Sequence, residues 1–445
     1  MGHIEFIVGL FIRTGTFETE NKVLNNLNGG IMKSIKVVNF KSFEEIDVKL
    51  RKFNVLIGAN ASGKSNFISV FRFIRDIAQS GLENAISLQG GIEYLRNMKV
   101  GASRNMTIKI VSDAKFGRVV RRNGKLLGIE SEETIYEFSL KCYKRRSSYR
   151  VEQDRLIQKL KFFNLHDRNG KKLEKGELIG EGQITVWKSN GKFKIRLEKD
   201  RNVELDEDTF FPPFFKEIDF PHNTLLLETP FMYFPVREIF TDISIFDFDP
   251  KLPKKAAPIT GKAQLEEDGS NLSIVLKNIL ADKDKRRKLL NLLQYFLPFV
   301  ESIDVEKFAD KSLLFKLKES YFEKEFIPAS LISDGTINIT ALIIALHFEK
   351  NPLVIIEEPE RNIHPSLISK VVEMIKDASQ KKQILITTHN PEVIKYVDID
   401  DLLLISRDEN GFSRITRPAD KAVLKAFLEN EIGVEELFVQ NLLEI

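Results

Sequence analysis

The residues best suited to chemistry form a glycine-rich loop. Residues 58–65 read Gly-Ala-Asn-Ala-Ser-Gly-Lys-Ser and match G-x-x-x-x-G-K-[ST] in full, between an apolar run and a helical pattern. Backbone N–H groups of such a loop surround an anion, and the helix N-terminus adds partial positive charge. We expect Lys64 to contact the β- and γ-phosphates of a nucleotide and the Ser65 hydroxyl to ligate Mg²⁺. The predicted nucleotide-binding residues here are Gly58, Ala59, Asn60, Ala61, Ser62, Gly63, Lys64, Ser65 and Asn66.

A pair of carboxylates follows a second apolar run. Residues 353–356 are Leu-Val-Ile-Ile, and Glu357 and Glu358 come directly after them. A buried strand of this kind delivers carboxylates to the edge of the sheet where ligands bind in open α/β folds. We expect Glu357 to hold the metal and Glu358 to act as a general base, a role that contributes about 10²–10⁴-fold in rate. An acidic pair on the surface is the alternative.

Two shorter motifs lie on either side of these carboxylates. Residues 333–336 precede an apolar helical pattern, so Ser333 can cap the helix and the glycine lets a phosphate approach the helix N-terminus. His389 follows the apolar run 384–387 and is placed to sense a γ-phosphate. Taken alone, residues 333–336 are better explained as an ordinary helix start, and His389 as an ordinary structural histidine. Because both motifs lie close in sequence to the acidic pair, we interpret them as part of a nucleotide site. The predicted signature residues are Ser333, Asp334, Gly335 and Thr336.

Taken together, these motifs resemble the ABC-type ATPase head shared by SMC proteins, RecF and the overcoming-lysogenization-defect family. The similarity is greatest to compact "AAA" ATPases of bacterial anti-phage defence and abortive-infection operons. It covers roughly residues 32–110 and 260–445. The elements that carry it are residues 40–43 before the P-loop, the 333–336 signature loop, the 357–365 Walker B and D-loop segment, the 388–390 switch, and residues 269–272 and 433–437.

The resemblance implies ATP hydrolysis at a site that a second copy completes. The signature loop of one copy would face the P-loop of the other in a head-to-tail homodimer, or higher oligomer, around two ATP molecules and Mg²⁺. The implied catalytic residues are Glu358, His389 and Lys64. Lys41 would join the nucleotide-binding set, and the implied Mg²⁺ ligands are Ser65 and Glu357, with Gln89 as a further candidate. Glu357 departs from the usual Asp of such proteins, and a solvated loop glutamine is the alternative for Gln89.

The implied function is the sensor or regulatory ATPase of an anti-phage defence system that controls a separate effector, a nuclease or a toxin. Only residues 390–445 follow His389, too few for a nuclease domain with its own core, so we expect the effector on another polypeptide. Two alternatives remain open: a RecF-like DNA repair or maintenance ATPase, and a non-hydrolysing, ATP-dependent scaffold.

Composition narrows the choice of partners. The net charge of +3 is too small to indicate nucleic-acid binding by the whole chain. Residues 141–200, however, contain 17 Lys and Arg against 8 Asp and Glu. Basic residues interleaved with aromatics could follow a phosphate backbone, so DNA or RNA is a candidate partner, and a solvated surface is the alternative. The single cysteine, Cys142, and the lack of any apolar run near the roughly 20 residues of a membrane span predict a cytoplasmic protein without a membrane segment.

The predicted fold is α/β, a P-loop NTPase of the ABC/SMC head type with a mostly parallel sheet covered by helices on both faces and a large α+β insertion. Residues 32–110, with Walker A, and 261–445, with the helical signature region and Walker B, would form the two halves of the ATPase domain. Residues 111–260 would form the basic insertion, without coiled-coil arms. Residues 1–31 look like an extension, because Met32 could be the natural start. An ordinary strand and loop is an equal alternative.

Overall fold

The computed structural model describes residues 31–420 except for short internal stretches. These exceptions are residues 114, 123–124, 144–147, 169–171, 190, 211–217, 230–235 and 309–310. The predicted N-terminal extension, apart from Ile31, and the segment 433–437 lie outside the described residues.

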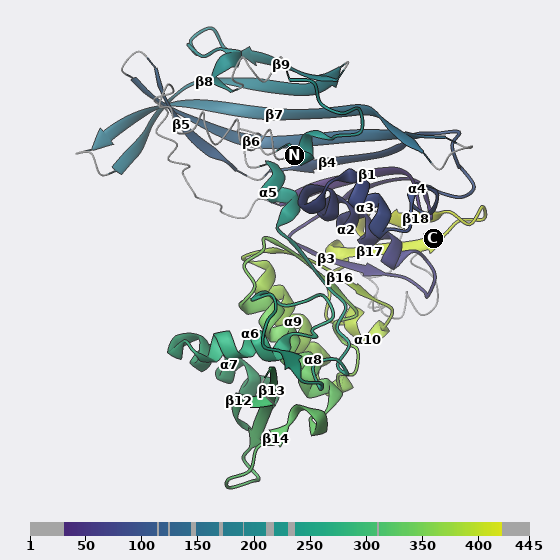
Figure 1. The fold of residues 1–445 in the computed structure, drawn as a ribbon, viewed down its shortest axis with the longest axis vertical. Coiled ribbons are helices and arrows are strands. Elements are labelled where there is room, and N and C mark those ends of the chain that lie inside the picture. Colours follow the sequence, from purple (N-terminus) through teal and green to yellow (C-terminus); the bar gives the residue numbers. More distant parts are fainter. Residues whose placement is uncertain are drawn as a thin grey trace.

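A six-stranded sheet forms the centre of the molecule (Figure 1). Its order is β10-β15-β16-β3-β17-β18, and every neighbouring pair is parallel except β17 with β18. The strands are β10 (Ile243–Phe246), β15 (Leu353–Glu357), β16 (Gln383–Thr388), β3 (Phe53–Ile57), β17 (Leu402–Arg407) and β18 (Ser413–Thr416). The parallel strands are mostly buried along their length, as expected when both faces of a sheet are covered. The predicted α/β fold with a mostly parallel sheet is confirmed.

Helices pack on both faces of this central sheet. Alternate side chains of a strand point to opposite faces, so Leu56 joins the hydrophobic core around α2 (Lys64–Ser80), whereas Val55 joins the core of the other helices. Those helices are α6 (Leu272–Leu280), α7 (Lys283–Phe296), α8 (Asp334–His347) and α9 (Ile368–Ser379). Helix α8 is apolar and buried nearly all round, which explains the uninterrupted apolar pattern of its sequence.

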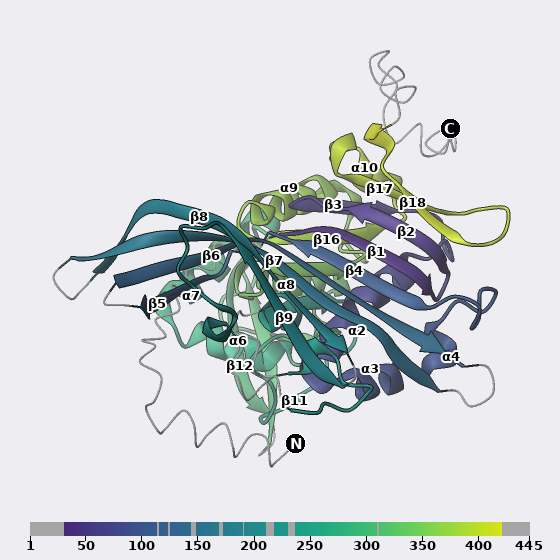
Figure 2. The same ribbon diagram turned by 90° about the horizontal axis from the view of Figure 1, so that it is seen from above.

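An eight-stranded antiparallel sheet lies on the far side of α2 (Figures 1 and 2). Its order is β2-β1-β4-β6-β7-β8-β9, and β5 pairs with β6. The strands are β1 (Met32–Phe40), β2 (Phe43–Lys49), β4 (Met106–Ser112), β5 (Gly117–Arg122), β6 (Lys125–Cys142), β7 (Tyr149–Arg168), β8 (Lys172–Ser189) and β9 (Lys192–Lys199).

The domain boundary expected at residue 110 can be compared with the strands of this sheet. The predicted boundary at residue 110 falls inside β4, which pairs with β1 on one side and β6 on the other. Much of the predicted α+β insertion is therefore strand that widens a sheet begun before it. Strand β10, also within the predicted insertion, pairs with β15 in the central sheet. Strand partners that are far apart in sequence leave no local signal, so these pairings could not be predicted from the sequence.

A small third sheet and short helices complete the described fold. Strands β11 (Ala257–Pro258), β12 (Val300–Phe308), β13 (Ser312–Glu319) and β14 (Ile327–Pro328) form a sheet near α6 and α7, at the lower end of Figure 1. The remaining short helices are α3 (Leu82–Leu88), α4 (Ile92–Leu95), α5 (Val236–Thr241) and α10 (Pro391–Ile394), with 3-10 turns η1 (Glu207–Thr209), η3 (Leu226–Glu228), η4 (Ala329–Leu331), η5 (Pro365–Leu367), η6 (Ile399–Asp401) and η7 (Pro418–Asp420). None of the helices described here has the length and apolar character needed to cross a membrane.

One buried amide joins the two large sheets. Gln383, only 2% exposed, begins β16. Its Nε2 donates to the carbonyl oxygens of Met32 at 2.9 Å and Arg51 at 2.8 Å, and its Oε1 accepts from the Met32 N–H at 2.9 Å. A strand of the central sheet is thereby bonded to the first strand of the antiparallel sheet.

Replacing Gln383 with Ala is expected to lower the free energy of unfolding by about 2–5 kcal/mol, because three backbone groups lose their partner where water has little access. Chemical denaturation without nucleotide measures this loss. The control is Gln380→Ala, an exposed glutamine at the end of α9, which should change stability by no more than about 0.5 kcal/mol. Equal losses for the two variants would contradict the role given to Gln383.

Candidate functional site

The P-loop lies between β3 and α2 and wraps around its own lysine. The Lys64 ammonium donates to the carbonyl oxygens of Gly58 at 2.7 Å and Ala59 at 3.0 Å. Gly63, the residue before α2, has φ of 118°, which only glycine adopts without strain. The Ser62 hydroxyl is buried and has no hydrogen-bond partner among the described residues. The loop thus combines a cation, an unused donor and a helix N-terminus, which suits an anionic ligand.

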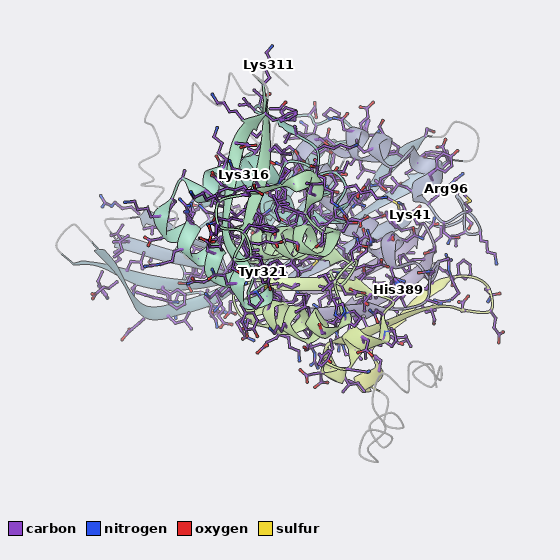
Figure 3. All side chains as sticks on the ribbon, turned by 90° about the horizontal axis from the view of Figure 1, so that it is seen from below. Lys41, Arg96, Lys311, Lys316, Tyr321 and His389 are labelled. Carbon is purple, nitrogen blue, oxygen red and sulfur yellow. The ribbon has the colours of Figure 1, made fainter. Side chains whose placement is uncertain are left out.

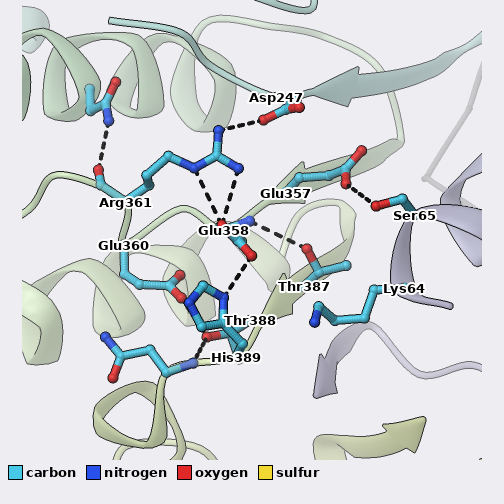
Figure 4. Close-up of polar contacts among 12 residues, drawn as sticks. Lys64, Ser65, Asp247, Glu357, Glu358, Glu360, Arg361, Thr387, Thr388 and His389 are labelled. Carbon is cyan, nitrogen blue, oxygen red and sulfur yellow. Dashed lines mark hydrogen bonds and ion pairs between the residues drawn. The ribbon is translucent and has the colours of Figure 1, made fainter. Parts of the chain in front are cut away.

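The predicted metal-binding pair is in direct contact. The Ser65 hydroxyl donates to Glu357 Oε2 at 3.2 Å, because β16 alone separates β15 from β3 (Figure 4). Burial raises the pKa of Glu357, and the nearby Asp247 carboxylate raises it further, while the hydrogen bond from Ser65 lowers it. No group of three or more His, Cys, Asp or Glu side chains suited to a metal occurs in the described part of the chain. One hydroxyl and one carboxylate fit Mg²⁺, which takes few protein ligands and keeps water and phosphate oxygens.

Glu358 is held from both sides by cationic or polar groups (Figure 4). Its Oε1 lies 2.7 Å from His389 Nδ1, and its Oε2 accepts from Arg361 Nη2 at 3.1 Å. Arg361 Nη1 in turn donates to Asp247 Oδ1 at 2.8 Å. Burial alone would raise the pKa of Glu358, but the hydrogen bonds from His389 and Arg361 outweigh it, so its pKa lies below the ordinary value. Glu358 is therefore ionised near neutral pH and able to accept a hydrogen bond from water.

The backbone at Glu358 is unusual in a way that aims its side chain. Its φ is 46°, a left-handed conformation that non-glycine residues rarely adopt and that costs of order 1–3 kcal/mol. Its N–H donates to the Thr387 carbonyl oxygen at 3.0 Å, which ties the end of β15 to β16. Strain of this kind clusters at functional sites, and here it turns Glu358 toward His389.

Glu360 is a neighbour that the sequence analysis missed. It is 7% exposed, its Oε1 accepts from the Thr388 hydroxyl at 2.5 Å, and its Oε2 has no hydrogen-bond partner among the described residues. Burial raises its pKa. Thr388 also accepts from the Asn390 N–H at 2.9 Å, so Glu360 fixes the segment that carries His389. The sequence shows that Glu360 follows Glu358 closely, but nothing in the sequence indicates that Glu360 is buried.

Arg361 and Asp247 were also missed. Arg361 follows the acidic pair closely, yet an arginine in a turn is ordinarily solvated. Asp247 comes directly after β10, more than a hundred residues earlier in the chain. Only the pairing of β10 with β15 brings this carboxylate to the site, and nothing local in the sequence indicates that pairing.

The predicted signature loop starts α8. The Ser333 hydroxyl caps the helix by accepting from the Thr336 N–H at 3.1 Å. The Asp334 carboxylate lies 2.5 Å from the Lys254 ammonium. These contacts are the helix start that the sequence predicts.

The same loop packs against the segment that follows Walker B. A β-carbon at Gly335 would lie 2.7 Å from the Asn362 carbonyl oxygen, so only glycine permits this approach. One turn further on, Asn338 Nδ2 donates to the Arg361 carbonyl oxygen at 2.6 Å. Among the described residues no hydrogen bond or ion pair joins residues 333–336 to the P-loop, so one chain does not bring these two elements into polar contact.

Lys41 and Gln89 bond each other, and Asn66 bonds the residue that follows Lys41. The Lys41 ammonium donates to Gln89 Oε1 at 2.9 Å, and burial, followed by the nearby Arg72 charge, lowers the pKa of Lys41. Asn66 Nδ2 donates to the Ser42 hydroxyl at 2.9 Å. The Gln89 side-chain oxygen therefore accepts from Lys41, and Gln89 makes no hydrogen bond to the predicted metal ligands Ser65 and Glu357.

Three lysines of the basic segment 141–200 pair with acids of the same sheet. Lys159, on β7, pairs with Glu133 of the neighbouring β6 at 2.7 Å, and Lys175, on β8, pairs with Glu130 of β6 across β7 at 2.6 Å. Lys161 also pairs with an acid on β6. These cross-strand pairs favour the solvated-surface interpretation of the described part. Lys144, Arg145 and Arg146, the basic run of this segment, lie outside the described residues.

Comparison with known proteins places this site in a family. A family model described as "AAA domain, putative AbiEii toxin, Type IV TA system" matches residues 53–395, from the P-loop strand through His389. Among curated proteins, the chain is 28% identical over 185 residues to urease accessory protein 2 of Cryptococcus neoformans var. grubii. It is 33% identical over 59 residues to Septu protein PtuA of Bacillus thuringiensis.

These curated matches are partial. They cover 38% and 13% of this chain, and only 13% and 15% of the relatives' own lengths. Solved structures with a similar fold include an SMC head bound to the C-winged helix domain of ScpA, with a TM-score of 0.46, 14% identity and coverage of 86% of this chain and 97% of that chain. The SMC head domain from Thermotoga maritima gives a TM-score of 0.40, 13% identity and coverage of 87% and 98%.

Replacing Lys64 with Ala is expected to weaken ATP binding by roughly 100-fold or more, because it removes the charge-assisted hydrogen bonds that a phosphate would accept. Titration with a fluorescent ATP analogue measures the affinity. Lys52→Ala, at an exposed lysine just before β3, is the matched control and should bind like the parent chain. Unchanged affinity in the Lys64 variant would exclude this loop as the phosphate site.

Proposed function

This chain belongs to that AAA domain family of P-loop ATPases, and we propose that it is an ATP-hydrolysing switch that closes as a head-to-tail homodimer around two ATP molecules. One observation supports this above the others. The P-loop, the acidic pair and His389 meet at one edge of the central sheet, while the signature loop makes no polar contact there in the described chain. A second copy would supply the missing element.

In this proposal the P-loop binds the phosphates. Lys64, now bonded to two loop carbonyls, would exchange them for the β- and γ-phosphate oxygens, and the unused Ser62 hydroxyl is a further donor. Mg²⁺, when bound, would neutralise phosphate charge. Ser65 and Glu357 are the residues that would hold it, and the extra methylene of Glu357 relative to Asp lets its carboxylate reach the Ser65 hydroxyl directly.

Glu358 would orient the attacking water. Its lowered pKa keeps it ionised, and its contacts with Arg361 and His389 fix the carboxylate in space. His389 lies at the end of β16 and would report the γ-phosphate to Glu358 through their shared hydrogen bond. Arg361 connects the same carboxylate to Asp247 and, through its carbonyl, to Asn338 of α8. Hydrolysis at one end of this network would then release the signature helix at the other.

The cellular role that we propose is regulation of a separate effector, a nuclease or a toxin, in cytoplasmic anti-phage defence. Two findings support it: the family description, which refers to an AbiEii toxin, and the partial similarity to Septu protein PtuA. The site has the groups needed to bind one nucleotide and one metal ion. We assign no nuclease activity to it. Closing and opening of the dimer would be the signal that the effector receives.

Glu358→Gln is expected to keep ATP binding but slow hydrolysis by about 10²-fold or more, the contribution typical of a general base. Phosphate release and ATP titration measure the two effects separately. Glu357→Gln is the matched comparison and should instead raise the Mg²⁺ concentration needed for turnover. If Glu357→Gln stops turnover at saturating Mg²⁺ and Glu358→Gln does not, the roles of the two acids are reversed. Full ATP binding with no turnover by the parent chain would identify a scaffold.

Mixing Lys64→Ala with Ser333→Arg chains is expected to restore part of the lost ATPase activity. A mixed dimer has one site in which an intact P-loop faces an intact signature loop, whereas each variant alone has none. Activity is measured over a series of mixing ratios, with each variant alone as the control. Absence of any recovery, with dimers shown to form, would count against a shared site.

A further inference from the structure

Two exposed apolar patches occur on the described surface, and each adjoins one half of the proposed composite site. The hairpin patch consists of Tyr321, Phe322, Phe326 and Leu331, which follow β13 and end two residues before Ser333. The α4 patch consists of Leu88, Tyr94 and Met98, around α3 and α4. The exposed fractions are 76% for Tyr321, 76% for Leu331, 78% for Met98 and 58% for Tyr94. Exposed aromatic and Met side chains are enriched at protein interfaces.

The α4 patch is attached to the nucleotide side of the site. The Lys41 N–H donates to the Leu95 carbonyl oxygen at 2.7 Å, and the Lys41 ammonium bonds Gln89, so this patch and Lys41 form one unit. Figure 3 shows Arg96, Lys41 and His389 on the right-hand side of the molecule and Tyr321 nearer the centre of the view. Leu331 of the hairpin patch is two residues from Ser333, and Lys41 precedes Ser42, whose hydroxyl accepts from Asn66 at the start of α2. The hairpin patch therefore adjoins the signature loop, and the α4 patch adjoins the P-loop.

The rims of the two patches carry opposite charge. Arg96, Lys99 and Arg104 adjoin the α4 patch, and the Arg96 guanidinium makes no hydrogen bond or ion pair with the described residues. Glu323 and Glu325 lie within the hairpin patch, are exposed, and are likewise without a polar partner in the described chain. The exposed Lys324 lies between them, so residues 323–325 have a net charge of −1. The α4 patch includes Glu93, so with Arg96, Lys99 and Arg104 its net charge is +2. The two patches therefore have net charges of opposite sign.

We propose that the hairpin patch of one copy packs on the α4 patch of a second copy when the ATP-bound dimer closes. This inference rests on the proposed function, because the pairing of signature loop with P-loop across two copies also brings the adjoining patches together. A two-fold axis repeats the contact, so each dimer has two hairpin–α4 contacts. Apolar side chains would provide the buried area, and the charged rims would fix the register and exclude wrong partners.

Charge exchange tests this contact. With a slowly hydrolysed ATP analogue, Arg96→Glu is expected to raise the dimer dissociation constant about tenfold or more, since it places like charges together. Glu323→Arg with Glu325→Arg should do the same. Combining all three changes in one chain should restore dimerisation toward the parent value. Sedimentation velocity measures the constants. Lys311→Glu, at an exposed lysine labelled in Figure 3 and outside both patches, is the control and should change little.

ATP affinity measured on every variant separates patch effects from damage to the nucleotide site. Met98→Asp is a second test of the α4 patch, because this side chain is 78% exposed and its loss leaves the core intact. Dimerisation of the parent chain that none of these variants weakens would overturn the inference while leaving the proposed function standing. Weakening by the single-patch variants without recovery in the combined variant would overturn the pairing of these two patches. A parent chain that binds the analogue but never dimerises would instead refute the proposed function itself.

Discussion

The site depends on the parallel pairing of β16 between β3 and β15. This pairing sets the ends of three strands at one edge, so that Ile57, Glu357 and Thr388 are followed by the P-loop, Glu358 and His389. Parallel strands cannot be joined by a tight turn, and the helices that connect them cover both faces of the sheet. The candidate site residues are therefore positioned by backbone hydrogen bonds inside a buried sheet. Gln383, at the other end of β16, ties the same strand to the antiparallel sheet.

Around this edge, Glu358 is the point where separate elements meet. Its carboxylate bonds His389 and Arg361, and the backbone carbonyl of Arg361 accepts from Asn338 of the signature helix. The strained φ of Glu358 is compensated by these contacts and by the bond of its N–H to β16. Three consecutive hydrogen bonds thus connect Glu358 to His389 on one side and, through Arg361, to α8 on the other.

Much of the fold, and the strands and helices that carry the candidate site, could be predicted because they depend on short stretches of sequence. The glycine loop, the apolar strand before Glu357 and the cap at Ser333 all have short-range causes, and the structure has a strand or helix at each of them. The antiparallel sheet could not be delimited, because β4 and β6 are paired across a gap in sequence. Asp247 could not be predicted as a site residue for the same reason, because β10 and β15 are also far apart in sequence. Glu360 was missed because sequence spacing does not distinguish a buried carboxylate from a solvated one.

The charges on the surface also cannot be judged from the local sequence, because their partners lie on distant strands. Residues 141–200 are strongly basic in sequence, yet three lysines of β7 and β8 (Lys159, Lys161 and Lys175) each pair with a glutamate of β6. Arg96, Glu323 and Glu325 show the reverse, because none of these side chains has a hydrogen bond or ion pair in the described chain. These unpaired charges beside exposed aromatic side chains are the observation on which the proposed contact between two copies rests. On this molecule they adjoin the two elements, P-loop side and signature side, that a single chain keeps out of polar contact.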